Sequence, residues 1–119
     1  MSEVQIVLCT FPEPSRARHI GTLLVEKQLA ACVNLIPGVE SIFSWKGRIS
    51  KEQEVLAVFK TTGDRLEELE RLMEELHPYD LPELLILPVG GSEPYLNWVR
   101  SVTCAVSYTH LTLPTKRIV

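Results

Sequence analysis

The sequence lacks the features that mark several large classes of protein. It has no C-x-x-C pair among its three cysteines, Cys9, Cys32 and Cys104, so neither a zinc ribbon nor a dithiol redox site is expected. No apolar run reaches the about 18 residues that a membrane-spanning helix needs, and the first residues carry no basic region typical of a signal peptide. The net charge is −3 and no dense basic stripe is present. We therefore expect a cytoplasmic protein with reduced thiols, and neither a membrane nor a nucleic acid as its partner.

Catalytic motifs that can be recognised from sequence are also missing. There is no glycine-rich phosphate loop, no G-x-S-x-G nucleophile elbow and no H-E-x-x-H helix. The pair Gly90-Gly91 is too short to form a phosphate loop. The sequence therefore predicts a protein that is not an enzyme, with no catalytic residues.

The composition indicates one globular domain followed by a different segment. The chain has 119 residues, of which 45% are hydrophobic and 23% are charged, which is ordinary for a folded domain. After Arg100 the sequence becomes rich in Ser and Thr and contains no Asp or Glu. We predict a domain over residues 1–100 and an atypical C-terminal tail over residues 101–119, foreign to that domain.

Apolar periodicity predicts the elements of the first half. Residues 4–9 form a β-rich apolar run, and residues 14–30 repeat apolar side chains at helical spacing. Residues 32–44 and 53–61 alternate as strands do, the first with a bulge or kink at Pro37-Gly38. Residues 45–48 are predicted to join these two strands as a hairpin turn.

The second half continues the same alternation of element types. Asp64 is predicted to cap a second helix that ends near His77, with Leu66, Leu69, Met73 and Leu76 facing the core. Its many glutamates are interpreted as a solvated face rather than a cation site. The continuous apolar run 84–87 predicts a strand buried on both faces, and residues 92–100 predict a short helix.

This order predicts an α+β fold, a ferredoxin-like βαββαβ sandwich with a short C-terminal helix. The crossover rules place the first and third strands in the centre of an antiparallel sheet. In that topology the end of the first strand and the end of the second helix lie at one edge of the sheet. Cys9 and His77 are therefore expected to be close, beside the hairpin at residues 45–50.

Cys9 and His77 are the candidate metal ligands. A thiolate and an imidazole suit copper, as Cu(I) or Cu(II), and zinc, although a closed structural site usually needs four ligands. The alternative is structural, with His77 as a cation at a helix C-terminus and Cys9 as a core residue. A nucleophilic Cys9–His77 dyad is a further hypothesis.

His19 and His110 are predicted to be surface residues. Trp45, Tyr79, Tyr95 and Trp98 suit either a protein–protein interface or local packing.

Five stretches of the sequence together resemble the CutA divalent-cation-tolerance family. They match in order and spacing between about residue 4 and residue 100, and they are residues 29–34 (LAACVN), 45–47 (WKG), 60–62 (KTT), 77–83 (HPYDLPE) and 95–98 (YLNW). The resemblance implies a homotrimer similar in architecture to the PII-type signalling proteins, which we expect to form through residues 32–62 and 82–99. It also implies copper binding, because Cys9 and His77 match the positions associated with copper in the family. Leu76 stands where copper-binding bacterial members can carry a second histidine.

The expected function is therefore a non-enzymatic, trimeric role in divalent-cation tolerance, with copper as the candidate ion. The alternative is a PII-like sensor that binds a small anionic ligand in clefts between subunits. An acyl-phosphate hydrolase is a third hypothesis, since the fold can host that chemistry. It is disfavoured because Arg16, Arg18 and Asn34 stand at poor positions for the arginine and asparagine that such an enzyme needs.

Overall fold

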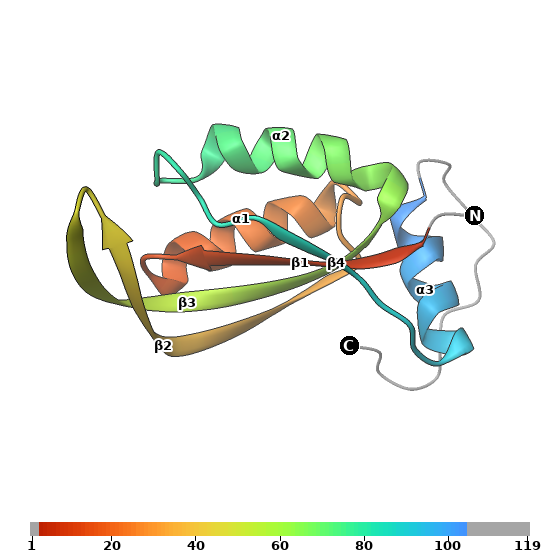
Figure 1. Ribbon diagram of the computed structural model, residues 1–119. Coiled ribbons are helices and arrows are strands. Elements are labelled where there is room, and N and C mark those ends of the chain that lie inside the picture. The colour runs from red at the N-terminus through yellow and green to blue at the C-terminus, as the bar shows by residue number, and fades with distance from the viewer. Residues whose placement is uncertain (1–2, 105–119) are drawn as a thin grey trace.

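Four strands form one antiparallel sheet, and helices α1 and α2 cover one of its faces (Figure 1). The computed structural model describes residues 3–104. The strand order is β2-β3-β1-β4, so the first and third strands are central and the predicted ferredoxin-like α+β fold is confirmed. The elements are β1 (Val4–Phe11), α1 (Pro14–Glu26), β2 (Cys32–Trp45), β3 (Arg48–Thr62), the 3-10 turn η1 (Gly63–Arg65), α2 (Leu66–Leu76), β4 (Leu85–Pro88) and α3 (Glu93–Thr103).

The side chains of β1 alternate between two hydrophobic clusters. Val7, Cys9 and Phe11 are fully buried in the main core, where they pack with α1, α2 and β3. Val4 belongs to a second cluster with Leu96 and Val99 of α3. Because successive side chains of a strand point to opposite faces, α3 covers the face of the sheet that α1 and α2 leave open, at the start of β1.

The hairpin of β2 and β3 has the turn that the sequence predicted. Lys46 and Gly47 have φ angles of 51° and 76°, and positive values at both central residues are typical of a type I′ turn. The predicted bulge is also confirmed, because the β2–β3 register shifts between Ile36 and Val39, around Gly38. Figure 1 shows the distal part of this hairpin bending toward the side of the sheet that carries the helices.

The first helix is shorter than predicted. It ends at Glu26 rather than at residue 30, because Gln28 has a left-handed φ of 61° that breaks the helical path. The backbone N–H groups of Leu29 and Ala30 turn back to the Leu24 carbonyl, and both side chains are buried. Burial of the 29–31 segment therefore replaces a last helical turn.

The second helix begins later than the capping pattern predicted. The N-cap of α2 is Arg65, not Asp64, because the 3-10 turn η1 precedes the helix. The Asp64 carboxylate accepts a hydrogen bond of 2.6 Å from the Thr62 hydroxyl. The predicted apolar stripe is correct in its centre, since Leu69 and Met73 are fully buried, and the predicted end at His77 is confirmed.

The fourth strand is exposed, which contradicts the prediction that residues 84–87 are buried on both faces. In β4, Leu85, Ile86 and Leu87 are 55%, 37% and 47% exposed. Its only partner among the described strands is β1, so it forms an edge of the sheet. A continuous apolar run indicates that a strand will be covered, but it cannot tell whether the same chain supplies the cover.

The last helix runs past the expected domain boundary at residue 100. It continues to Thr103, whose side chain is 1% exposed and lies 3.2 Å, oxygen to oxygen, from the Thr62 hydroxyl. Packing against the sheet therefore extends at least to Thr103. The rest of the predicted tail, residues 105–119 with His110, lies outside the described residues.

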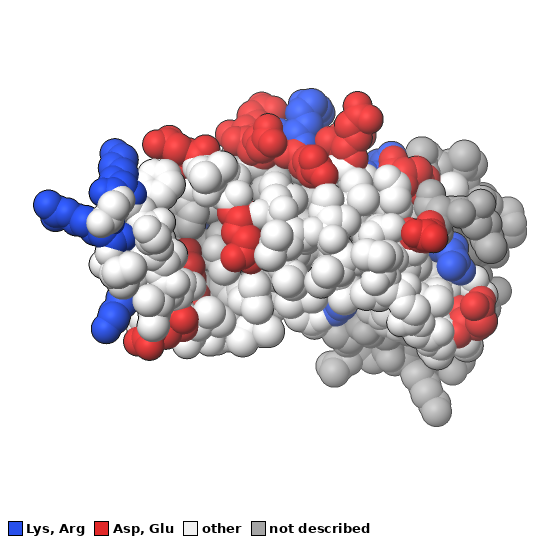
Figure 2. Space-filling model, viewed as in Figure 1, with Lys and Arg blue, Asp and Glu red and all other residues white. Residues whose placement is uncertain are grey.

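Charge is distributed unevenly over the surface. Figure 2 shows acidic side chains gathered over α2 and basic side chains gathered at the distal end of the β2–β3 hairpin, where Lys46, Arg48 and Lys51 are exposed. Most glutamates of α2 are exposed, as the solvated-face interpretation predicted. None of the helices in the described part of the chain is long and apolar enough to cross a bilayer.

Candidate functional site

The structure brings Cys9 and His77 to one edge of the sheet, as the topology predicted. Cys9 lies in β1 and is followed by Thr10, whose backbone oxygen is 2.8 Å from His77 Nε2. His77 is the C-cap residue of α2, and its ring stacks on Phe11 with centroids 4.6 Å apart. These contacts connect the end of α2 to the end of β1.

Both ring nitrogens of His77 have partners. Because a carbonyl oxygen can only accept, Nε2 carries the proton and donates to Thr10, while Nδ1 accepts from the Tyr79 backbone N–H at 3.1 Å. The residue is only 7% exposed. Burial lowers the pKa of His77, against the opposing effects of the Thr10 hydrogen bond and the Glu54 charge. His77 is therefore a neutral residue that holds a loop, not a helix-terminal cation.

Cys9 is a core thiol. It is fully buried, and its sulfur lies 3.8 Å from the Thr10 carbonyl oxygen. Burial, followed by the charges of Glu83 and Glu54, raises the pKa of the Cys9 thiol to about 12. A thiol with this pKa is protonated at neutral pH, so it is neither a ready nucleophile nor a ready metal ligand.

The arrangement of this pair does not fit a preformed copper site. A ligating imidazole must offer a free nitrogen and a ligating cysteine must be ionised, and neither condition holds at Cys9 and His77. In the described part of the chain, no three His, Cys, Asp or Glu side chains are grouped so that they could hold a metal ion. Metal binding by Cys9 and His77 stays a prediction of the sequence.

A second pair at the same edge was not predicted. The Tyr79 hydroxyl donates a hydrogen bond of 2.6 Å to Glu54 Oε2. Glu54 lies in β3 and is only 8% exposed. Burial, together with the hydrogen bond to Glu54, raises the pKa of Tyr79 above its ordinary value. The phenol is therefore a constant hydrogen-bond donor to this carboxylate at physiological pH.

Tyr79 and Glu54 line a pocket of about 550 Å³ between the bent hairpin and the loop that follows α2. We call it the carboxylate pocket. Three of its residues are aromatic and three are acidic, and none is basic. Its lining consists of Pro12, Phe43, Trp45, Ser50, Glu52, Glu54, Pro78, Tyr79, Asp80 and Leu81.

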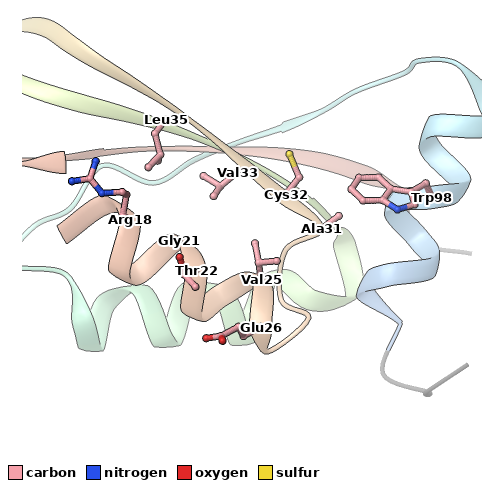
Figure 3. Close-up of a pocket in the computed structure, with 10 residues that line it drawn as sticks. All are labelled: Arg18, Gly21, Thr22, Val25, Glu26, Ala31, Cys32, Val33, Leu35 and Trp98. Carbon is pink, nitrogen blue, oxygen red and sulfur yellow. The ribbon is translucent and has the colours of Figure 1, made fainter. Parts of the chain in front are cut away.

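A second hollow, of about 440 Å³, runs beside the edge strand β2. We call it the edge groove. Figure 3 shows α1 on one side of it, β2 along another and Trp98 of α3 at one end. Apart from Arg18 and Glu26 its lining is uncharged; the lining residues are Arg18, Gly21, Thr22, Val25, Glu26, Ala31, Cys32, Val33, Leu35 and Trp98.

Beside this groove, polar residues from the five stretches that resemble the CutA family connect neighbouring segments of the fold. Lys60 donates to the Asn34 side-chain oxygen and lies 3.5 Å from the Cys32 sulfur. Thr61 donates to the Leu29 carbonyl at 2.6 Å and fixes the turn after α1. Because Asn34 accepts from Lys60, it is not placed to orient a hydrolytic water. The Tyr95 hydroxyl is buried and has no hydrogen-bonded nitrogen or oxygen partner among residues 3–104.

The importance of Glu54 could not be derived from local pattern alone. Glu54 and Tyr79 are 25 positions apart, and only the fold brings β3 against the loop that follows α2. The available signal was that Glu54 is the one carboxylate in the predicted strand 53–61. His19 is exposed, as predicted.

The chain is similar in sequence to characterised families and proteins. The family model described as CutA1 divalent ion tolerance protein matches residues 5–102. The divalent-cation tolerance protein CutA of Thermus thermophilus is 43% identical over 100 residues, which cover 83% of this chain and 97% of that protein. The mouse protein CutA is 43% identical over 112 residues, which cover 93% of this chain and 63% of the mouse protein. The chain therefore spans less than two thirds of the mammalian relative.

Solved structures agree with the sequence comparisons. The divalent cation tolerance protein of Thermus thermophilus superposes with a TM-score of 0.83 at 42% identity, covering 85% of this chain and 99% of that one. CutA1 from Oryza sativa superposes with a TM-score of 0.84 at 32% identity, covering 88% and 97%. The family match, the sequence identity and the shared fold together show that this chain belongs to the CutA1 divalent ion tolerance protein family.

Proposed function

We propose that the chain acts as a non-enzymatic homotrimer in divalent-cation tolerance or the response to such ions, within the cytoplasm. One observation carries the assembly: both edge strands, β2 and β4, expose apolar side chains. Ile36 and Ile42 of β2 are 46% and 61% exposed, and β4 exposes three consecutive apolar residues. An apolar edge strand offers unpaired backbone groups as well as hydrophobic area, so it favours pairing with another chain.

The two edges differ, which determines the kind of assembly. If β4 of one copy seats against β2 of the next, each contact is head-to-tail, and such contacts can close into a ring. The edge groove beside β2 supplies the space for apolar side chains of an incoming strand. Three copies is the number that the resemblance to the family implies. The part of the open sheet face that carries the half-buried Leu8, Leu56 and Val58 would then be covered.

Light scattering tests the assembly directly. At micromolar concentration the expected mass is three times the 13.4 kDa of the chain. A mass equal to that of a single chain would contradict the proposal. Cys9 and Cys32 form no disulfide in the described structure, and a reductant in the sample keeps them from linking separate copies.

Copper binding by Cys9 and His77 is a separate part of the proposal. If they are ligands, Cys9→Ser and His77→Ala each weaken copper binding, measured by calorimetry, while the trimer survives. Binding would also weaken as the pH falls, because protons compete for the imidazole and the thiol. Unchanged copper titrations in both variants would leave His77 as a residue that positions a loop and Cys9 as a core residue. The trimer does not depend on this outcome.

The second candidate function is that of a small-ligand sensor, and the carboxylate pocket favours it. A concave pocket with aromatic walls and a few polar groups is the usual form of a small-molecule site. The sequence predicted an anionic ligand. Glu52, Glu54 and Asp80 would repel an anion from this pocket. Calorimetry with nucleotides is therefore expected to give no binding that depends on Glu54.

A further inference from the structure

Glu54 is a buried carboxylate without a cationic partner among residues 3–104. The residue as a whole is 8% exposed. Its Oε2 atom accepts from Tyr79, and no hydrogen bond from the described residues reaches Oε1. Within the same part of the chain the ion pairs are those of Arg71 with Glu68 and Glu75, and none involves Glu54. Buried charges in proteins are normally paired or bound to a cation. The described residues therefore do not supply the partner that the burial of Glu54 calls for.

Glu54 also belongs to the wall of the carboxylate pocket. Glu54 is one of the residues that line this pocket of about 550 Å³, and Glu52 and Asp80 add negative charge to the same lining. The rings of Phe43, Trp45 and Tyr79 supply aromatic surface. The basic side chains at the hairpin tip are not part of the lining. A counter-charge for Glu54 would therefore have to come from outside residues 3–104.

The geometry favours an organic cation over a bare metal ion. A compact metal ion needs several donors at short distance, and no such group of three side chains is present in residues 3–104. An ammonium group needs less, because one carboxylate balances its charge and aromatic faces attract it through the ring quadrupole. A pocket of about 550 Å³ has the size typical of small-molecule sites.

We propose that the carboxylate pocket binds a small organic ammonium compound, with the cationic head between Glu54 and the rings of Trp45 and Phe43. This inference rests on the candidate function of a ligand sensor and names the chemical class of its ligand. It does not depend on copper, but five of the pocket's lining residues lie within residues 32–62, through which we expect the trimer to form. Tyr79 positions Glu54 through its hydroxyl and contributes its ring to the wall.

The fluorescence of Trp45 provides the test. The chain has two tryptophans, so Trp98→Phe leaves Trp45 as the only one. Choline is the probe, and its neutral carbon isostere, 3,3-dimethyl-1-butanol, has the same shape without the charge. We expect a saturable fluorescence change with choline and none with the isostere. Calorimetry on the unsubstituted chain repeats the titration, in case Trp98→Phe disturbs folding or assembly.

Glu54→Gln is the decisive variant. Gln keeps an oxygen that can accept from Tyr79, so the pocket should keep its shape while it loses the charge. Choline affinity is expected to fall by about tenfold or more. The matched control is Glu40→Gln, an exposed glutamate of β2 outside the lining, which removes the same charge and should leave the affinity unchanged.

Three results would overturn the proposal. One is the absence of choline binding in both assays while the mass remains that of the trimer. This result would disprove the ammonium ligand and would leave the proposed assembly unaffected. Another is equal binding of choline and its neutral isostere, which would indicate an apolar site only. The third is a Glu54-dependent response to MgCl2 or CuCl2 without a response to choline, which would assign the pocket to a metal ion.

Discussion

The edge groove and the carboxylate pocket are two hollows of similar size with opposite chemistry. Their volumes are about 440 and 550 Å³, and each has a tryptophan in its wall, Trp98 in the groove and Trp45 in the pocket. The groove follows an edge strand whose backbone is unpaired on one side within the described sheet. The pocket lies where the hairpin bends over a loop, and it contains a buried carboxylate.

This difference shows that volume alone does not indicate what a hollow binds. Beside β2, unpaired backbone groups and apolar side chains suit an extended strand of another polypeptide. At the pocket, Glu54 has no counter-ion among the described residues and three rings stand around it, so the fitting ligand is a small cation. We therefore expect the groove to act as a protein interface and the pocket as a ligand site.

The largest expected effect is the loss of assembly in Ile86→Lys. Ile86 lies in the exposed edge strand β4 and is 37% exposed in the single chain, so a lysine can be accommodated without unfolding it. In the ring, the lysine would be buried against the apolar groove of the next copy, where an unpaired charge is strongly unfavourable. Light scattering should therefore give the mass of one chain.

Leu81→Lys is the matched control for that variant. Leu81 is 73% exposed and lines the carboxylate pocket rather than the edge groove. The same apolar-to-lysine change should leave the mass of the assembly unchanged. If Leu81→Lys dissociates the assembly and Ile86→Lys does not, the pocket is the interface, and the functions that we assign to the two hollows must be exchanged.

The second prediction concerns Tyr79→Phe. This variant removes the hydroxyl that donates to Glu54 and leaves a buried carboxylate without its described donor. We expect the free energy of unfolding, from urea titration monitored by circular dichroism, to fall by about 1–3 kcal/mol. In the double variant with Glu54→Gln the loss should be smaller, since an amide is less costly to leave unpaired than a charge. Equal losses in both backgrounds would show that the hydroxyl does not act through Glu54.

The fold could be predicted from sequence because its determinants are local. Alternation in residues 53–61, helical spacing in α2 and the turn residues Lys46-Gly47 each define an element within a few positions. The crossover rules then place Cys9 and His77 at one edge without any knowledge of side chains. The approximate location of the candidate site was therefore predictable.

The chemistry of the site was not predictable, because it depends on burial and on distant contacts. The same His77 ring could bind a metal or hold a loop, and only its two hydrogen bonds distinguish these roles. Glu54 becomes important through a hydrogen-bond partner 25 positions away. The exposure of β4 was not predicted, because a continuous apolar run looks the same in two cases. The strand can be covered by another chain or by other parts of the same chain.

The third prediction uses the pH dependence of stability. Burial lowers the pKa of His77 below its ordinary value of 6.5, so the unfolded chain binds a proton more readily than the folded one. His77 therefore contributes full stability above pH 6.5, and this contribution is lost as the pH falls through the lower pKa of the folded state. The urea midpoint should fall across this range.

His77→Gln should make that pH profile flatter. Gln does not titrate, and its amide can still donate to the Thr10 carbonyl. The control is His19→Gln, which changes an exposed histidine and should keep the wild-type profile. A profile that stays as steep in His77→Gln as in the wild type would show that another group is responsible, and that His77 is not held neutral beside the carboxylate pocket.

The smallest effect is expected at the tyrosine beside the edge groove. The ring of Tyr95 contacts Trp98, with centroids 5.6 Å apart, and its buried hydroxyl has no hydrogen-bonded nitrogen or oxygen partner among residues 3–104. Removal of a buried, unpaired hydroxyl recovers the cost of its desolvation. Tyr95→Phe in the single-chain Ile86→Lys background should therefore raise the free energy of unfolding by up to about 1 kcal/mol, the opposite sign to Tyr79→Phe.

The same substitution in the assembled protein shows whether the groove is completed by a second copy. If an incoming strand supplies the acceptor that Tyr95 lacks, Tyr95→Phe should destabilise the trimer by about 1 kcal/mol while it stabilises the single chain. Thermal melts of the two backgrounds, recorded at matched concentration, give this comparison. Stabilisation in both would show that the hydroxyl stays unpaired on assembly. If Tyr95→Phe destabilises the single chain, the Tyr95 hydroxyl forms a hydrogen bond with the nearby Cys32 sulfur. Burial, and after it the nearby Cys32, raises the pKa of Tyr95.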